Sequence, residues 1–326
     1  MRATNRLAAI DIGTVTTRLL VADVGPSSII EVERSTDITH LGKDVALSGR
    51  LSAEGMERVE SVVARYAVRM RELGVEAWRA VATSASRDAE NAAEFTRMLA
   101  AHGIEPEVIA GDIEARLMFA GATYGHAVEG VLVNDIGGGS TELVLGDSVV
   151  RGGRSVAKIE VACSADVGSR RLTDLMSASD PPTREELATA TTWVRERITP
   201  FFATLSRQPS TCIALAGTAT TVSAIHQGLV TYDPMRVHGS VLSVDDIHAV
   251  FERLAALPVA RRATEVVGLH PGRAAVIVAG ILILLVILEC AQLDSTLVSE
   301  HDILYGMLLD VYSRLESDAR GDFGLE

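Results

Sequence analysis

The stretch DIGTVTTR, Asp11 to Arg18, decides the fold because it returns further along the chain as DIGGGSTE, Asp135 to Glu142. Each copy lies between two runs of aliphatic and β-branched residues, within Leu7 to Val24 and Val131 to Gly146. Such runs around a short Gly/Thr-rich stretch predict a strand, a tight loop and a second strand. Two copies of this unit in one chain indicate a duplicated domain.

Helical and strand patterns alternate between the two copies. Helices are expected over residues 52–73 and 89–101, with strands over 77–82 and 107–109. A further helix, 113–124, leads the chain toward the second copy. This alternation predicts mixed α/β domains rather than an all-α or all-β protein.

The pattern continues after the second copy. A helix is expected over 184–204, and a strand over 211–216 runs into a third small-residue loop at Gly217 and Thr218. Further helices are expected over 244–256, 273–289 and 301–315.

We therefore expect two α/β domains, residues 1–125 and 126–326, whose loops face each other across an active-site cleft. A C-terminal helix within about 301–326 is expected to pack back on the first domain.

The composition limits the class of protein. The 326 residues are 48% hydrophobic and 22% charged, enough apolar material for two domains with a core each. The three cysteines form no CxxC or Cys/His pattern, so they indicate neither a disulfide framework nor a zinc site, and they fit a reducing cytoplasm. The net charge of −13 argues against nucleic acid as a partner.

No segment predicts export or a membrane span. The N-terminal residues lack the charged start, apolar core and cleavage site of a signal peptide. The apolar run from Ala274 to Leu288 is shorter than the roughly 20 residues needed to cross a bilayer. We expect a buried core helix there, a cytoplasmic location and no membrane partner.

The second loop has the composition of a phosphate site. Consecutive glycines leave backbone N–H groups free to converge on an anion. The expected phosphate-binding residues here are Gly137, Gly138, Gly139, Ser140 and Thr141. Asp135 and Glu142 are carboxylates on the flanking strands, and they are candidate ligands of Mg²⁺, which prefers a few carboxylates together with phosphate oxygens. The alternative is a glycine-rich hairpin with two solvated acids.

The first loop is less distinctive on its own, because it also fits an ordinary strand turn. Its similarity to the second loop favours a second phosphate-binding loop that faces the first across the cleft. The expected contacts on this side are Asp11, Gly13, Thr14, Thr16, Thr17 and Arg18.

At this point the chain resembles the exopolyphosphatase/guanosine pentaphosphate phosphohydrolase family. The resemblance lies in the two loops and, in order along the chain, in VATSASRDAEN (81–91), IAGDIEARLMFAG (109–121), LAGTATT (215–221), VHG (237–239) and VSEHDILYGML (298–308). It implies two ribonuclease H-like domains of the actin, sugar kinase and Hsp70 type. It also implies metal-dependent release of terminal phosphate from inorganic polyphosphate or guanosine pentaphosphate, the short form of the family, and a homodimer.

The resemblance also implies roles for single residues. Glu114 matches the glutamate that serves the family as general base, and Arg87 matches an arginine that reaches the active site. Gly217 and Thr218 match a position where relatives hold adenosine or phosphate. His238 is open between a cleft residue and a structural histidine.

Four positions depart from the family pattern. Val15 replaces a usual Asn, Thr16 stands where Ser is frequent, Ile113 replaces the first glutamate of Gly-x-Glu-Glu, and Ala275 stands where an acidic residue often follows Arg-Ala. Val15 and Ile113 keep open a second interpretation, a catalytically weak sensor that binds polyphosphate or an alarmone. A kinase of the same fold is a third option, which the match at Glu114 disfavours.

Overall fold

The first of two sheets contains the first copy of the repeated unit. The computed structural model describes residues 4–151, 154–176 and 179–320. In this sheet the strand order is β3-β2-β1-β4-β5, with β1 antiparallel to β2 and parallel to β4. The strands are β1 (Asn5–Ile12), β2 (Thr16–Gly25), β3 (Ser28–Ile38), β4 (Ala77–Ala82) and β5 (Glu107–Val108).

The second sheet repeats this arrangement, in the order β10-β11-β9-β6-β7-β8. Again three consecutive antiparallel strands are followed by a parallel neighbour, here β9 beside β6. The strands are β6 (Val128–Ile136), β7 (Thr141–Arg151), β8 (Arg154–Ala165), β9 (Thr211–Leu215), β10 (Val241–Ser243) and β11 (Ser295–Val298). The predicted α/β class and duplicated fold are confirmed.

The two repeated aspartates occupy the same place in their sheets. Asp11 is the next-to-last residue of β1 and lies opposite Arg18 of β2, and Asp135 is the next-to-last residue of β6 and lies opposite Glu142 of β7. The copies therefore differ in charge at one equivalent position, with an arginine in the first and a glutamate in the second.

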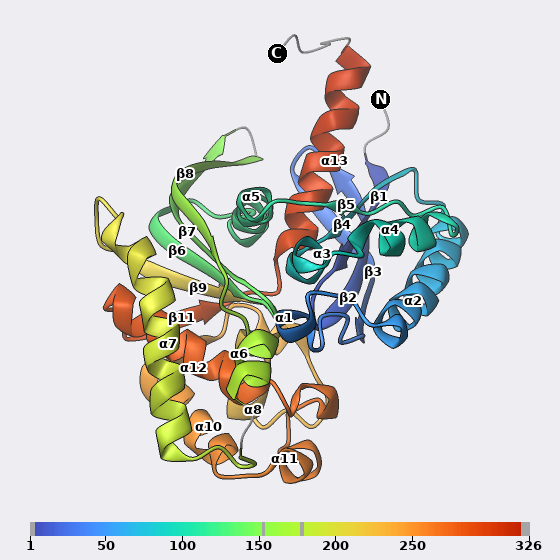
Figure 1. The fold of residues 1–326 in the computed structure, drawn as a ribbon. Coiled ribbons are helices and arrows are strands. Elements are labelled where there is room, and N and C mark those ends of the chain that lie inside the picture. The colour runs from blue at the N-terminus through green and yellow to red at the C-terminus, as the bar shows by residue number, and fades with distance from the viewer. Residues whose placement is uncertain (1–3, 152–153, 177–178, 321–326) are drawn as a thin grey trace.

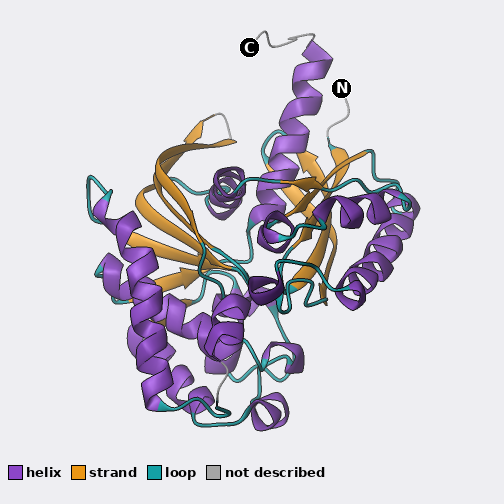
Figure 2. Cartoon of the chain, in the orientation of Figure 1, coloured by secondary structure: helices purple, strands orange, loops and turns teal. Residues whose placement is uncertain are grey.

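Two helices lie between the sheets and the others lie outside them, as Figures 1 and 2 show. The inner helices are α5 (Gly111–Ala122) and α13 (Ile303–Arg320). Of the outer helices, α2 (Ala53–Glu72) and α4 (Ala92–Ala100) accompany the first sheet. The helices around the second sheet are α6 (Ser169–Met176), α7 (Arg184–Ala203), α8 (Ala216–His226), α9 (Pro234–Val237), α10 (Val244–Ala255), α11 (Val259–Glu265) and α12 (Ile277–Ala291). The short helices α1 (Val45–Ser48) and α3 (Ser84–Asp88) lie where the first half of the chain meets α6.

Most predicted helices lie within a few residues of their expected bounds. The helix expected over 273–289 starts late, because a 3-10 turn at Pro271–Arg273 precedes α12. The loop expected at Gly217 and Thr218 is the first turn of α8, since that helix begins at Ala216 directly after β9. The apolar run is buried in α12, as expected. Within the described residues, no helix is both long and apolar enough to cross a membrane.

Helix α13 packs on the first sheet and on α5, although it follows β11 of the second sheet. Its crossing with α5 is close because both helices have a glycine there. A Cβ on Gly121 would collide with the carbonyl of Asp302, and one on Gly306 with the carbonyl of Leu117. Residues 1–3 and 321–326 of the predicted domains lie outside the described residues, and the boundary near residue 125 stays a prediction.

Candidate active site

Both repeated loops line one cavity of about 1240 Å³. It opens where the two sheets approach each other, since its walls include β1 and β2 of the first sheet and β6 and β7 of the second. The predicted site residues on its walls are Asp11, Gly13, Thr14, Thr16, Arg18, Glu114, Asp135, Gly137, Gly138, Gly139, Ser140, Glu142, Gly217 and Thr218. The structure therefore brings together residues that are far apart in the sequence.

The two loops touch each other directly, and glycine permits this approach. A Cβ on Gly138 would lie 2.6 Å from Cγ2 of Val15 and 2.8 Å from Cβ of Thr14. A Cβ on Gly139 would lie 2.9 Å from Oγ1 of Thr14 and would also collide with Ser84. These separations are too short for any larger residue unless the neighbouring side chains or the loops themselves move.

Three predicted site residues are not on the cavity wall. The hydroxyl of Thr17 is buried and bonded to that of Thr39 at 3.1 Å. The hydroxyl of Thr141 is also buried and donates to the carbonyl of Val167 at 2.5 Å. Arg87 lies behind the wall. The period-two alternation of a strand explains both threonines, because Thr17 and Thr141 point away from the face that carries the cavity.

Glu114 lies in the first turn of α5, where its negative charge suits the helix N-terminus. Its Oε2 accepts a hydrogen bond from Nη1 of Arg87 at 2.6 Å. Burial raises the pKa of Glu114 to about 7, although the charge of Arg87 acts in the opposite direction. A carboxylate with a pKa near neutrality is suited to exchange protons with water.

The two candidate metal ligands, Asp135 and Glu142, are buried carboxylates whose negative charge is not balanced by an ion pair in the described residues. Burial raises the pKa of Asp135 to about 7, and no hydrogen bond reaches its carboxylate within the described residues. Burial also raises the pKa of Glu142, whose Oε1 accepts from the hydroxyls of Ser140 at 2.8 Å and Ser164 at 2.7 Å.

These two carboxylates fit Mg²⁺, which commonly takes one or two carboxylates and completes its shell with water and substrate phosphate oxygens. A full protein cage is not formed. Among residues 4–151, 154–176 and 179–320, no group of three or more His, Cys, Asp or Glu is arranged to hold a metal.

Sequence patterns did not identify several charged residues of the cavity. Asp302, immediately before α13, forms an ion pair with Arg18. Arg273, in the 3-10 turn before α12, donates from Nη1 to the carbonyl of Gly217 at 2.9 Å and to the hydroxyl of Thr221 at 2.7 Å. Neither lies in a repeated motif. Asp302 lies within the segment 298–308 that carries the family resemblance, but no role was assigned to it there.

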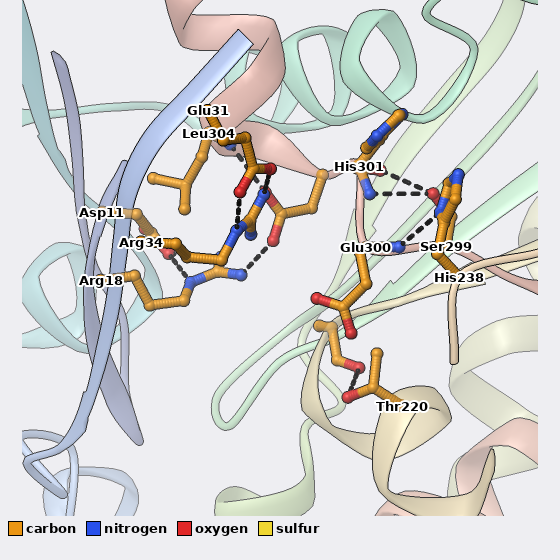
Figure 3. A network of polar contacts seen from close by, with 12 residues as sticks. Asp11, Arg18, Glu31, Arg34, Thr220, His238, Ser299, Glu300, His301 and Leu304 are labelled. Atoms are coloured by element: carbon orange, nitrogen blue, oxygen red, sulfur yellow. Dashed lines mark hydrogen bonds and ion pairs between the residues drawn. The ribbon is translucent and has the colours of Figure 1, made fainter. Parts of the chain in front are cut away.

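Figure 3 shows polar contacts on two walls of the cavity. One carries the ion pairs of Arg18 with Asp11 and of Arg34 with Glu31, and the other carries His238, Ser299, Glu300 and His301. His238 lines the cavity, and its Nδ1 accepts the backbone N–H of Glu300 at 3.2 Å. It therefore has a structural bond as well as a place in the cleft.

Known proteins resemble this chain over nearly its whole length. The profile of the Ppx/GppA phosphatase family matches residues 20–314. Exopolyphosphatase 2 of Mycobacterium tuberculosis is 39% identical over 326 aligned residues, which cover 95% of this chain and 99% of the relative.

Solved structures agree. An exopolyphosphatase-like protein has a TM-score of 0.89 at 36% identity, with 97% of this chain and 100% of the other covered. The Ppx/GppA protein of Aquifex aeolicus has a TM-score of 0.78 at 32% identity, with 96% and 99% covered. These neighbours have the actin-like fold that the duplicated sheets of this chain also form. The chain belongs to the Ppx/GppA phosphatase family.

Proposed function

We propose that this chain is a metal-dependent exopolyphosphatase that hydrolyses the terminal phosphate of inorganic polyphosphate or of guanosine pentaphosphate. The observation that carries the proposal is the position of Glu114, a carboxylate of pKa about 7, in the same cavity as both loops. The similarity to Exopolyphosphatase 2 supports a hydrolase and polyphosphate as the substrate.

In this proposal the loops hold the phosphates. The N–H groups of Gly138 and Gly139 and the hydroxyls of Thr14 and Thr16 supply donors around the point where the loops meet, whereas the hydroxyl of Ser140 donates to Glu142. Backbone N–H groups are suited to this task because they are fixed by the fold and bear no negative charge. Thr17 and Thr141 support the loops rather than the substrate, because their hydroxyls are bonded to protein.

Glu114 is the proposed general base. Hydrolysis of a phosphoanhydride requires a water oriented in line with the leaving oxygen and a group that accepts its proton. Oε2 of Glu114 is fixed by Arg87, so Oε1 is left for the water. Arg87 positions the base from behind the cavity wall and also stabilises its ionised form, since its charge lowers the pKa of Glu114.

Asp135 and Glu142 are the proposed ligands of the cation. When bound, Mg²⁺ supplies positive charge to the phosphate oxygens and thereby stabilises the charge that develops in the transition state. When ionised, these carboxylates repel phosphate until a cation neutralises them, so binding of cation and of polyanion should support each other.

The sensor interpretation remains the second candidate because of two side chains. Ile113 is 37% exposed beside the base, where the family usually has glutamate. Val15 faces Gly138 across the loop contact and contributes no donor to the cavity. A protein that bound polyphosphate without releasing phosphate would fit this reading.

A panel of polyphosphates and guanosine nucleotides, assayed for phosphate release with and without Mg²⁺, tests the proposal. We expect Mg²⁺-dependent release from at least one substrate class. Binding without release from any substrate would establish the sensor instead. A homodimer and a cytoplasmic location also belong to the proposal; light scattering during size-exclusion chromatography would measure the first, and the three free cysteines are consistent with the second.

A further inference from the structure

Asp302 lies where the chain leaves the second sheet and enters the helix that packs on the first. It is 4% exposed, and its Oδ1 accepts the backbone N–H of Leu304 at 2.9 Å, which caps the start of α13. Its Oδ2 accepts from Nη1 of Arg18 on β2. One carboxylate thus caps a helix and pairs with an arginine of the cavity.

Arg18 is held by two carboxylates from different parts of the fold. Its Nε donates to Oδ2 of Asp11 at 3.0 Å, while Asp302 binds the other side of the guanidinium. The second arginine of this wall, Arg34, has a separate partner, since its Nη2 donates to Glu31 at 2.7 Å. Asp302 therefore acts on Arg18 by contact and on Arg34 only through its charge.

Asp135 is the carboxylate that this arrangement leaves without a partner. Arg18 is the cation that acts on Asp135 through its charge, yet it donates no hydrogen bond to it. Loss of Asp302 would leave Arg18 with Asp11 as its one remaining carboxylate partner, and a buried guanidinium is stabilised by a second hydrogen-bonded partner because buried charge is costly. Without Asp302, pairing of Arg18 with Asp135 would therefore become more favourable.

We propose that Asp302 is a positioning residue of the cation site: it holds the Arg18 guanidinium against Asp11 and thereby keeps the Asp135 carboxylate free for a divalent cation. The inference rests on the proposed function, in which Asp135 binds Mg²⁺. Asp302 acts through Arg18 and is not itself a metal ligand.

The test is a double-mutant cycle of cation binding to the full chain, without substrate. The probe is Mn²⁺, a hard cation with the same preference for carboxylate oxygens as Mg²⁺, and free Mn²⁺ is measured by electron paramagnetic resonance. Asp302→Asn keeps the oxygen that caps α13 but removes the charge that holds Arg18. We expect it to weaken Mn²⁺ binding by about 10-fold, within the usual range of coupling between contacting residues.

The same substitution in an Arg18→Gln background should leave Mn²⁺ affinity unchanged, because there is no guanidinium left to compete for Asp135. If the 10-fold loss persists in that background, Asp302 acts by its own charge or as a ligand, and the inference is wrong. Equal affinity of Asp302→Asn and the wild type also overturns it.

Asp310→Asn is the matched control, since Asp310 lies on α13, the helix that Asp302 caps, and forms an ion pair with Arg79 at 2.9 Å, away from the cavity. It should bind Mn²⁺ as the wild type does, and thermal unfolding of every variant shows that each is folded. If the wild type binds no Mn²⁺ at all, the proposed cation site itself fails. That outcome differs from a wild type and an Asp302→Asn variant that bind equally.

Discussion

Arg87 donates from one nitrogen, Nη1, both to Oε2 of Glu114 at 2.6 Å and to the carbonyl of Ile109 at 3.0 Å. The side chain of the proposed base is thereby tied to α3 on one side and to the start of α5 on the other. Arg87 does not line the cavity, so its effect on catalysis passes through Glu114.

The pH dependence of activity should reveal this ion pair. A general base acts when deprotonated, so kcat should rise with pH through about 7, where the pKa of Glu114 lies. Arg87→Met removes a cation that lowers this pKa, and we expect the rising limb to move to higher pH. Arg87→Lys, which keeps the charge, should shift it less. A limb at the same pH in wild type and Arg87→Met would show that Arg87 does not act on the base.

The buried charge of Asp135, which has no hydrogen-bonded partner in the described residues, should lower the stability of the protein as pH rises. Its pKa is raised to about 7, above the value in an unfolded chain, so this group favours the folded state only below the unfolded pKa. Its contribution is lost as pH rises toward 7. At pH 8 without a divalent cation, Asp135→Asn should therefore be more stable than the wild type by roughly 1 kcal/mol or more, and it should unfold at a higher temperature.

Adding Mg²⁺ should then separate the two proteins. The wild type gains stability by binding the cation, whereas Asp135→Asn gains little. A variant that responds to Mg²⁺ as strongly as the wild type in thermal unfolding would remove Asp135 from the metal site.

Part of this site could be predicted from the sequence and part could not. The repeated Asp-Ile-Gly loops predicted two facing phosphate loops, because strand, glycine and hydroxyl patterns are formed by neighbouring residues and can be recognised directly in the sequence. Glu114 required the family resemblance, since one glutamate at a helix start carries no local signal of catalysis. The places of Asp302 and Arg273 in the cavity could not be predicted, because only the packing of α13 and α12 brings them there.

The fold, too, was predicted from the sequence only in part. The first two strands of each copy were predicted, yet β3 and β8 were not. Both are edge strands of their sheets, and no residue of β3 is fully buried, so its sequence does not show the buried alternation that marks a strand. Arg34 and Glu31 come from β3 and were missed with it.

The contact between the loops gives a steric prediction. Gly138→Ala places a methyl group against Val15 and Thr14, which should cost about 1–3 kcal/mol of stability and raise KM by forcing the loops apart. Gly103→Ala is the control. Gly103 is exposed with a φ of 78°, so alanine there should cost about 1 kcal/mol through backbone strain while KM stays unchanged. Equal KM values for the two variants would contradict close packing of the loops around substrate.

Two neighbouring threonines test which hydroxyls bind phosphate. Thr16 lines the cavity, whereas the hydroxyl of Thr17 is bonded to Thr39 behind it. Thr16→Val should raise KM for polyphosphate several-fold, as expected when a hydrogen bond to a charged group is lost. Thr17→Val should lower stability with little effect on KM. The reverse pattern would place the phosphate on the other face of β2.

The hydrolytic rate of Glu114→Gln tests the central claim most directly. Glutamine keeps the size of the side chain and an oxygen to face Arg87 but cannot accept the proton of water. Single-turnover phosphate release from polyphosphate with Mg²⁺ should fall by about 10²-fold or more, while polyphosphate binding, measured separately, stays near that of the wild type. Release at a near wild-type rate from a folded Glu114→Gln variant would show that Glu114 is not the base.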